Sequence, residues 1–333
     1  MPPNSASSTA AATASSSAAF SASLSPTSPA LTSISTFVSA PTMAIDAAPE
    51  QVVRLFSIQQ APPKSKILHL IRHAEGTHNI SPDSHKMPLH WDARLTEKGI
   101  KQCQSLAKAT RYHYERQGGA SLDSTLTALD EQVERISAHS IHPSVGEVEA
   151  VIVSPMSRCL QTATLSFPHY CRNDLGGSSS SSSVSIIAHE SWRETTNFLC
   201  DSRRPLSQLQ NEFPCVDFDM ISHEDDPIWL KYESIYGSHD EFDGLRESKD
   251  GRHLARRVRE AWTWLASRRE NNLAICSHSA FFMHQFQPYL PEMMGLISYE
   301  DKEVERLMMD RRFDNCELRT VAFQTAEMAG GGL

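Results

Sequence analysis

Short apolar runs separated by longer amphipathic stretches organise the chain beyond about residue 60. Five runs have the length of a β-strand, at residues 66–71, 147–153, 184–188, 272–276 and 318–323. Apolar positions at helical spacing predict helices over 96–114 and 251–269, and Ser154-Pro155 is typical of a cap followed by proline at the first helical position. Because the predicted strands alternate with helices, the pattern indicates an α/β fold around a largely parallel sheet.

Low-complexity stretches bound and interrupt this pattern. The first 50 residues are mostly Ser, Ala, Thr and Pro, without Lys or Arg, and cannot bury enough apolar surface to offset the entropy of ordering them. We predict a disordered segment at 1–63, a folded domain at 64–325 and a flexible tail at 326–333. Inside the domain, 117–146 and the serine-containing 172–183 are predicted to be surface loops without catalytic content.

Acidic residues exceed basic ones, 40 to 31, which gives a formal net charge of −9. This balance argues against a broad nucleic-acid surface, which needs clustered cations. No apolar run reaches the roughly 18 residues of a membrane-spanning helix. The chain also has no HExxH motif and no His/Cys grouping with zinc spacing. We therefore predict no nucleic-acid partner, no membrane partner, no metal and no cofactor.

Seven cysteines lie at positions 103, 159, 171, 200, 215, 276 and 316, without a CxxC pair. An odd, scattered set is typical of a reducing compartment with free, mostly buried thiols. The N-terminal segment lacks a positively charged start followed by an apolar core, so no secretory signal is expected. It is Ser-rich and acid-poor like a transit peptide, but it lacks arginines. We predict a cytoplasmic location, with plastid or mitochondrion as the alternative.

Three polar clusters directly follow predicted strands. They occupy residues 72–79, 154–158 and 277–279. Each cluster alone has an ordinary structural explanation, such as a helix cap. In open α/β sheets, however, ligands bind beyond the carboxyl ends of the strands, and parallel neighbouring strands would bring the clusters to one edge. Their joint occurrence therefore favours a functional site.

The residue types in these clusters suit phosphate chemistry. Phosphoryl transfer needs cations around the equatorial oxygens, an in-line nucleophile and an acid for the leaving oxygen. Arg72 and Arg158 supply planar forks that match phosphate, and Arg158 would lie in a first helical turn, which also favours an anion. An imidazole such as His73 or His278 can act as the nucleophile or stabilise phosphoryl charge.

These motifs resemble those of the histidine phosphatase (phosphoglycerate mutase-like) superfamily. Residues 72–79, RHAEGTHN, resemble its RHG signature in the RHA-x-G-x-x-N form of a plant and fungal branch. Residues 92–99, DARLTEKG, are similar to its D-x-x-L-T-x-x-G segment. Residues 153–163, VSPMSRCLQTA, are similar to its S-P-x-x-R-x-x-Q-T-A helix start, and 277–279 match its second histidine motif. The resemblance covers about residues 65–325.

This resemblance implies a three-layer α/β/α sandwich and a histidine phosphatase-like catalytic domain. It also implies that His73 is the phosphorylated nucleophile. Arg72, Arg158 and His278 would form the phosphate pocket, and Asn79 would be a further ligand. No metal or cofactor is implied.

The superfamily's proton donor is a Glu or Asp, and Glu194 is the residue that the resemblance favours. It follows the third predicted strand in an Arg-Glu pair like that of the plant branch. An ordinary solvated carboxylate is the alternative interpretation of Glu194. Glu75 is a second candidate for the acid.

Several neighbouring residues carry weaker expectations. Ala74 stands where most members have Gly, and it is small enough for close backbone approach. Arg203 and Arg204 either rim the pocket and bind acidic substrate groups or form a solvated surface pair. Cys159 and Cys276 are interpreted as packing residues.

The leading hypothesis is a metal-independent, histidine acid-type phosphatase that hydrolyses a phosphomonoester through a phosphohistidine on His73, with a small phosphorylated metabolite as substrate. One alternative is a phosphoglycerate mutase-type phosphotransferase, but residues 80–89 do not resemble the Asn-rich, Phe-containing segment of the mutases. Another is a non-catalytic phosphate-binding regulatory module, which usually lacks the nucleophile or an arginine. Specificity would come from the variable segments 80–95 and 190–245. We make no prediction of the exact substrate or the oligomeric state.

Overall fold

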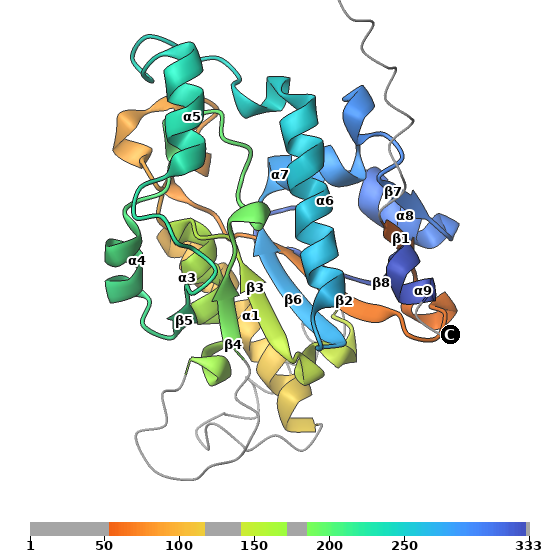
Figure 1. Cartoon of the computed structure of the whole chain (residues 1–333). Helices are drawn as coiled ribbons and strands as arrows, with labels where there is room; N and C mark the ends of the chain where they lie inside the picture. The colour runs from red at the N-terminus through yellow and green to blue at the C-terminus, as the bar shows by residue number, and fades with distance from the viewer. Residues whose placement is uncertain (1–52, 117–140, 172–184, 331–333) are drawn as a thin grey trace, which may run out of the picture. The chain divides into compact units, whose positions relative to one another are not determined.

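A single mixed sheet organises the residues that the computed structural model describes, namely 53–116, 141–171 and 185–330 (Figure 1). Its eight strands run in the order β5-β4-β3-β6-β2-β8-β1-β7. The pairings are parallel except those of β8 with β2 and β1, which are antiparallel. The strands are β1 (Val53–Phe56), β2 (Lys66–Arg72), β3 (Ala150–Val153), β4 (Ser185–Ala188), β5 (Val216–Asp217), β6 (Asn272–Ser277), β7 (Ile297–Tyr299) and β8 (Leu318–Gln324).

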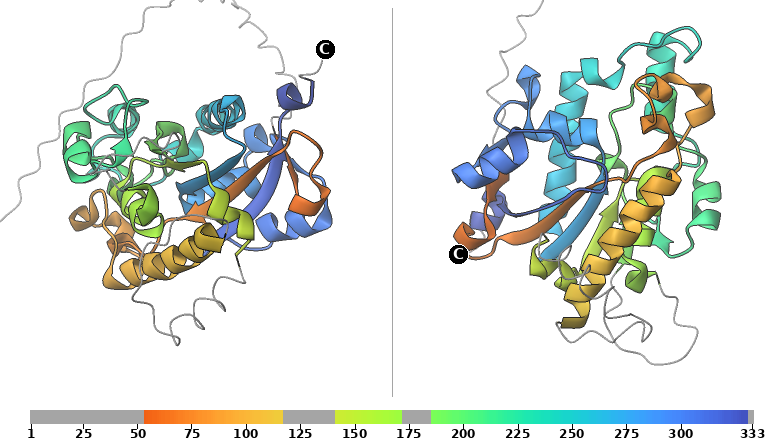
Figure 2. Two further views of the ribbon diagram at one scale, coloured as in Figure 1. Left: turned by 90° about the horizontal axis from the view of Figure 1, so that it is seen from below. Right: turned by 180° about the vertical axis from the view of Figure 1, so that it is seen from behind.

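Helices cover both faces of this sheet. Helices α1 and α3 lie on one face and α6 lies on the other (Figures 1 and 2). The predicted α/β/α sandwich around a largely parallel sheet is therefore confirmed. No helix in the described ranges is both long and apolar enough to span a membrane. The helices are α1 (Glu97–Arg116), α3 (Ser157–Ser166), α4 (Leu206–Glu212), α5 (Pro227–Tyr236), α6 (Gly251–Ser267), α7 (Ser279–Phe286), α8 (Lys302–Met309) and α9 (Ala326–Gly330).

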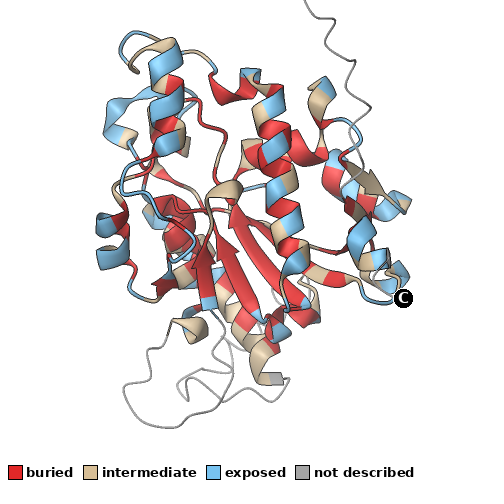
Figure 3. Cartoon of the chain, viewed as in Figure 1, coloured by how far each residue is buried: buried red, intermediate tan, exposed pale blue. Residues whose placement is uncertain are grey.

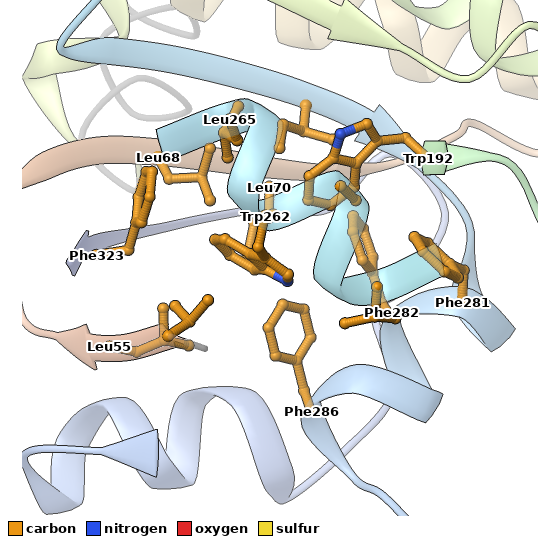
Figure 4. Packing of buried hydrophobic residues seen from close by; sticks show 14 of the residues in the cluster. Leu55, Leu68, Leu70, Trp192, Trp262, Leu265, Phe281, Phe282, Phe286 and Phe323 are labelled. Carbon is orange, nitrogen blue, oxygen red and sulfur yellow. The ribbon is translucent and has the colours of Figure 1, made fainter. Parts of the chain in front are cut away.

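The core lies on both faces of the central strands, because successive side chains of a strand point to opposite faces. Strands β3 and β6 are buried along their whole lengths (Figure 3). On one face, Leu68 and Leu70 of β2 pack in a cluster with Trp262 of α6, whose ring centroid is 5.3 Å from that of Phe323 (Figure 4). On the other face, Ile71 packs in a second cluster with residues of α1 and α3.

The predicted domain boundaries need correction at both ends. The disordered segment was expected to extend to residue 63, but β1 pairs with both β7 and β8, and its Val53 and Leu55 are fully buried. Four residues are too short a run to reveal a strand by periodicity. At the other end, α9 occupies 326–330 of the expected tail. The predicted disorder of 1–52 and the end of the tail lie outside the described residues.

The predicted loops are corrected in part. The end of the first one, Pro143–Glu147, forms a turn of 3-10 helix against α1, and its Val145 is fully buried. Val145 is buried because the turn packs in the same core cluster as Leu106 of α1. Residues 117–140 and 172–184 lie outside the described residues.

The helix expected to start at Ser154-Pro155 begins later. Met156 is the N-cap of α3, with extended backbone and no side-chain cap bond, and the helix starts at Ser157. The carboxylate of Asp92 takes the capping role from a distance, since it accepts from the backbone N–H of Ser157 at 2.9 Å and from its hydroxyl at 2.5 Å. Ser154 is therefore available for another partner, described below.

Cys171 and Cys215 form a disulfide, with Cα atoms 5.1 Å apart, within the usual range for such bonds. This corrects the expectation that all thiols are free, although Cys103, Cys159, Cys200 and Cys276 are free and buried and Cys316 is free and half-buried. Sequence spacing carried no signal for the pair, because the two cysteines are 44 positions apart.

Replacing Cys215 by serine is expected to lower the free energy of unfolding by about 2–4 kcal/mol, since the cross-link restricts the unfolded chain. Denaturant unfolding of wild type and variant without reductant measures this difference. As the matched control, a reductant should destabilise the wild type and leave the Cys215→Ser variant unchanged. If both cysteines of the non-reduced, folded wild type are alkylated, the disulfide is not present.

Candidate active site

The three polar clusters meet at the carboxyl ends of β2, β3 and β6, which are neighbours in the sheet. Backbone hydrogen bonds continue the ladders into the clusters, from the N–H of His73 to the Ser277 carbonyl at 2.9 Å and from the N–H of Ser154 to the Cys276 carbonyl at 3.0 Å. Parallel pairing in this register places the first residues after each strand side by side. The fold thus brings His73, Arg158 and His278 together.

The His73 imidazole is held in one tautomer. Its Nδ1 lies 2.7 Å from the carbonyl oxygen of Ala74, and because a carbonyl oxygen only accepts, Nδ1 carries the proton in the neutral ring. Burial lowers the pKa of His73 well below its ordinary value, and the charges of Arg158 and Arg72 lower it further. At neutral pH the ring is therefore uncharged, with the lone pair on Nε2.

His278 lies beside His73, with ring centroids 5.1 Å apart. Its Nδ1 accepts from Nε of Arg158 at 3.3 Å, so Nε2 carries the proton and donates to the hydroxyl of Ser154 at 2.7 Å. Burial and then the charge of Arg158 lower the pKa of His278. Ser154, predicted as a helix cap, instead orients this second imidazole.

Arg158 is almost fully buried in the first turn of α3, as the sequence predicted. Besides contacting His278, it donates from Nη1 to the Cys200 carbonyl at 2.6 Å and from Nη2 to the carboxylate of Asp201 at 3.2 Å. The guanidinium therefore links the second histidine to the turn at Leu199–Asp201. Within the described residues, Arg158 forms one salt bridge, with Asp201, and a buried arginine of this kind suits a site that binds an additional anion.

Arg72 and His73 rest on the segment that precedes β8. Arg72 donates from Nη1 to the Phe313 carbonyl at 2.8 Å, and its Nε is buried without a hydrogen bond in the described residues. Cys316, with a left-handed φ of 62°, directs its N–H to the carbonyl oxygens of Arg72 at 3.1 Å and His73 at 3.2 Å. This segment fixes the backbone of His73.

A second asparagine, Asn315, connects Asn79 to the backbone of His73. Nδ2 of Asn315 donates to the carbonyl of His73 at 3.1 Å and to Oδ1 of Asn79 at 3.4 Å. Oδ1 of Asn79 also accepts from the N–H of Gly76 at 3.2 Å. Its Nδ2 makes no hydrogen bond within the described residues, so that nitrogen can donate to a ligand.

Glu194 lies at the N-terminus of α7. Its carboxylate accepts from the backbone N–H of Thr195 and Phe281, both at 2.8 Å, and more weakly from that of Ala280 at 3.3 Å. Burial and then the charge of Asp201 raise the pKa of Glu194, while Arg158 opposes the shift. Glu194 is therefore not the ordinary solvated carboxylate of the alternative interpretation.

Glu75, the second candidate acid, faces away from this group. Its carboxylate pairs with Lys98 at 2.6 Å and accepts from Thr96 at 2.9 Å, both at the start of α1. These bonds lower the pKa of Glu75, with that from Lys98 the largest cause. A lowered pKa is the opposite of what a proton donor needs.

The remaining motif positions hold the clusters to one another. Thr162 accepts from the N–H of Ala74 at 3.0 Å and donates to the Arg158 carbonyl at 2.7 Å, so one hydroxyl bridges two clusters. Gln161 accepts from the N–H of Leu95 at 2.9 Å. A Cβ on Gly99 would collide with the Glu75 carbonyl, which explains the glycine there. These contacts are the structural reason for the residues at fixed positions in the motif segments 92–99 and 153–163.

Arg203 and Arg204 match neither of their expected roles. Arg203 is 2% exposed, and its guanidinium is used by the carboxylate of Glu190 and by four backbone carbonyls. Arg204 pairs with Asp92 at 2.8 Å and Glu212 at 2.8 Å. Both arginines are structural, because burial beside carboxylates and carbonyls consumes their donors.

The two cysteines beside the site are buried, as expected of packing residues. Cys276 packs in the second core cluster, and its sulfur lies 3.5 Å from the Cys159 carbonyl oxygen. Cys159 has a further contact, because its sulfur lies 3.3 Å from Nε2 of His278.

In the described ranges, no group of three or more His, Cys, Asp or Glu side chains is arranged to hold a metal ion.

Three site residues had no signal in the sequence. Asp201 pairs with Arg158, and Phe313 and Asn315 support Arg72 and His73. Asp201 belongs to no recognised motif, and the other two lie about 240 positions from their partners. Only the fold brings such residues to the site.

No family model matches this chain. The chain is 28% identical over 288 residues to phosphoglycerate mutase-like protein 1 of Arabidopsis thaliana, which covers 80% of this chain and 84% of the relative. A second Arabidopsis thaliana relative, phosphoglycerate mutase-like protein, is 28% identical over 279 residues and covers 78% of this chain and 84% of its own length.

Solved structures show weaker likeness. A phosphoglycerate mutase from Bacillus anthracis covers 78% of this chain and 91% of its own, with 11% identity and a TM-score of 0.37. A putative alpha-ribazole-5'-P phosphatase from Escherichia coli covers 77% and 89%, with 14% identity and a TM-score of 0.37. Both likenesses extend over most of the chain at low identity.

Proposed function

This chain is a relative of the phosphoglycerate mutase-like proteins, and from that relationship and its site geometry we propose that it is a phosphatase. It hydrolyses a phosphomonoester of a small metabolite through a phosphohistidine intermediate on His73. The observation that carries the proposal is a buried, uncharged His73 whose protonated Nδ1 is bound to a carbonyl, beside His278 and within the electrostatic range of two arginines.

In the first step, Nε2 of His73 attacks phosphorus and the bond to the leaving oxygen breaks. Arg72 and Arg158, whose charges act on His73, bind the equatorial oxygens and stabilise the charge of the transition state. Their positive charges also keep His73 from being protonated, so the nucleophile retains its lone pair at neutral pH.

The leaving alkoxide takes its proton from Glu194, whose raised pKa suits a general acid. In the second step a water molecule attacks the phosphohistidine, Glu194 takes the proton of that water, and phosphate leaves with His73 neutral again. Each group thus returns to its starting state. No step requires a metal ion.

The direct test is hydrolysis of p-nitrophenyl phosphate in the presence of EDTA. Metal-independent release of phosphate is the expected result. Inactivation by EDTA that added metal reverses would contradict the metal-independent mechanism. If a folded protein releases no phosphate from any of a panel of phosphomonoesters, the proposal is wrong.

A mutase is the second candidate, because both Arabidopsis relatives carry mutase-like names. A mutase returns the phosphoryl group to another hydroxyl instead of to water. Incubation with 3-phosphoglycerate separates the two reactions, since a phosphatase releases inorganic phosphate and a mutase forms the isomer. We expect inorganic phosphate without isomer.

Replacing Glu194 by alanine is expected to slow hydrolysis most for substrates with poor leaving groups. A general acid contributes about 100-fold or more when the leaving alkoxide needs a proton, whereas p-nitrophenolate leaves without one. Steady-state kinetics on an alkyl phosphate and on p-nitrophenyl phosphate measure the contrast. An unchanged rate on the alkyl phosphate would exclude Glu194 as the acid.

We also propose the cytoplasm as the compartment, with plastid or mitochondrion as the alternative. The Cys171–Cys215 disulfide is an observation against the cytoplasm, because stable disulfides are rare in reducing compartments. Fractionation of cells that produce the full chain tests it. Recovery with an organelle would favour the alternative.

A further inference from the structure

His78 is a third histidine at the candidate site, and no motif gives it a role. It lies in the turn Thr77–Asn79, which follows residues 73–76 after the end of β2. It is 8% exposed, and its ring centroid is 5.3 Å from that of His73. His73 therefore has two imidazole neighbours, since the ring of His278 is 5.1 Å away.

The imidazole of His78 is not committed to any protein partner in the described residues. Its Nδ1 is buried without a hydrogen bond. A buried polar nitrogen without a partner costs free energy, so packing alone does not account for a histidine at this position. Such a group is available to a bound ligand.

Gly76 makes the room that this ring occupies. A Cβ on Gly76 would lie 2.8 Å from both Nδ1 and Cε1 of His78, closer than real contacts allow. The backbone of Gly76, with φ −99°, is one that any residue adopts. The side-chain contact, and not the backbone, is therefore the reason for glycine. The loop is built around the His78 ring.

The charges that act on His78 are those of the phosphate pocket. Burial lowers its pKa most, and the next causes are Arg158, His73 and Arg72, followed by His90. Three of these residues are the ones proposed above to bind and accept the phosphoryl group. An uncharged imidazole in their midst offers one donor and one acceptor.

We propose that His78 is a substrate-binding residue that donates a hydrogen bond to an oxygen of the bound phosphoryl group. This inference rests on the proposed function, because it assumes that the phosphoryl group sits beside His73. The imidazole would add a neutral donor to a pocket whose other donors are mostly charged.

Binding of inorganic phosphate, measured by titration calorimetry, tests the inference without requiring turnover. Loss of one hydrogen bond to a charged ligand predicts an affinity about 10- to 100-fold weaker in His78→Ala. His78→Asn keeps an N–H near the position of Nδ1, the nitrogen without a partner, and should recover part of the affinity. The exposed His223 gives the matched control, since His223→Ala should bind phosphate like the wild type.

Gly76→Ala serves as the second variant if His78→Ala fails to fold. Its methyl group displaces the ring without removing it, so phosphate affinity should fall while the chain still contains the imidazole. If folded His78→Ala binds phosphate like the wild type, the inference is wrong. The same conclusion follows if Gly76→Ala, folded, binds phosphate unchanged.

Turnover separates a failure of this inference from a failure of the proposed function. If the wild type hydrolyses phosphomonoesters and His78→Ala has the same kcat/KM, only the role of His78 is wrong. If the wild type hydrolyses none but binds phosphate more tightly than His78→Ala, the proposed function is wrong and His78 is still a phosphate ligand.

Discussion

Replacing His73 by alanine is expected to reduce hydrolysis of p-nitrophenyl phosphate by about 10,000-fold or more, because loss of a covalent nucleophile removes the reaction path itself. The imidazole of His73 is neutral and oriented by the Ala74 carbonyl, an arrangement that alanine removes. Rates of phosphate release by wild type and variant, with EDTA present, measure the loss.

The variant should remain folded and should still bind phosphate, since Arg72, Arg158 and His278 are unchanged. His239→Ala is the matched control, because His239 is a partly exposed histidine that pairs with Asp240. It should turn over at the wild-type rate. Turnover that survives in His73→Ala would exclude the phosphohistidine mechanism.

Replacing Glu247 by glutamine is expected to lower the free energy of unfolding by about 3–5 kcal/mol, because it leaves a buried arginine without its charge partner. Glu247 is fully buried and accepts from Nε and Nη2 of Arg257, each at 3.0 Å. Arg257 in turn donates to the carbonyls of Arg193 and Glu194, at 2.7 and 3.4 Å. The pair therefore supports the segment that carries the candidate acid.

The same residue predicts how stability depends on pH. Burial alone would raise the pKa of Glu247, but Arg257 and the hydrogen bonds around the carboxylate lower it to about 2, from 4.5. A lowered pKa in the folded state contributes stability above pH 4.5 that is lost as pH falls toward 2. The contribution is about 3 kcal/mol. Glu247→Gln should lack this part of the acid destabilisation.

Denaturant unfolding at neutral pH and between pH 5 and about pH 2 measures both effects. The matched control is Glu260→Gln, on the same helix α6, where the carboxylate is exposed and forms a surface pair with Arg256. Its expected change is below about 1 kcal/mol. If Glu247→Gln is as stable as this control, the buried pair does not support the segment.

The three ends of β2, β3 and β6 could be predicted from the sequence for a physical reason. Each of these strands is a short apolar run that ends directly at a cluster of polar residues. This pattern involves only residues close together in the sequence, so it can be recognised without the fold. The clusters also carry arginine and histidine, residue types that suit phosphate chemistry. His73, Arg158 and His278 could therefore be assigned to one site before their distances were known.

Residues that serve the site from distant positions could not be predicted in this way. Asp201, Asn315 and the turn of Cys316 have no local periodicity and no motif, and each acquires its partner through long-range packing. Arg203 is the opposite case, a residue assigned to the site from the sequence that the fold uses elsewhere. Its position after the acid segment suggested a pocket rim, but it is buried and paired with Glu190.

The sequence by itself determined the α/β class, the strand ends that carry the clusters and the residue types of the site, because these depend on spacing within a few residues. Only the tertiary structure decided that β1 joins the sheet, that Ser154 orients His278 and that His78 lies beside His73. Those outcomes depend on which segments pack together, and that choice is made by burial and hydrogen bonding across the whole domain.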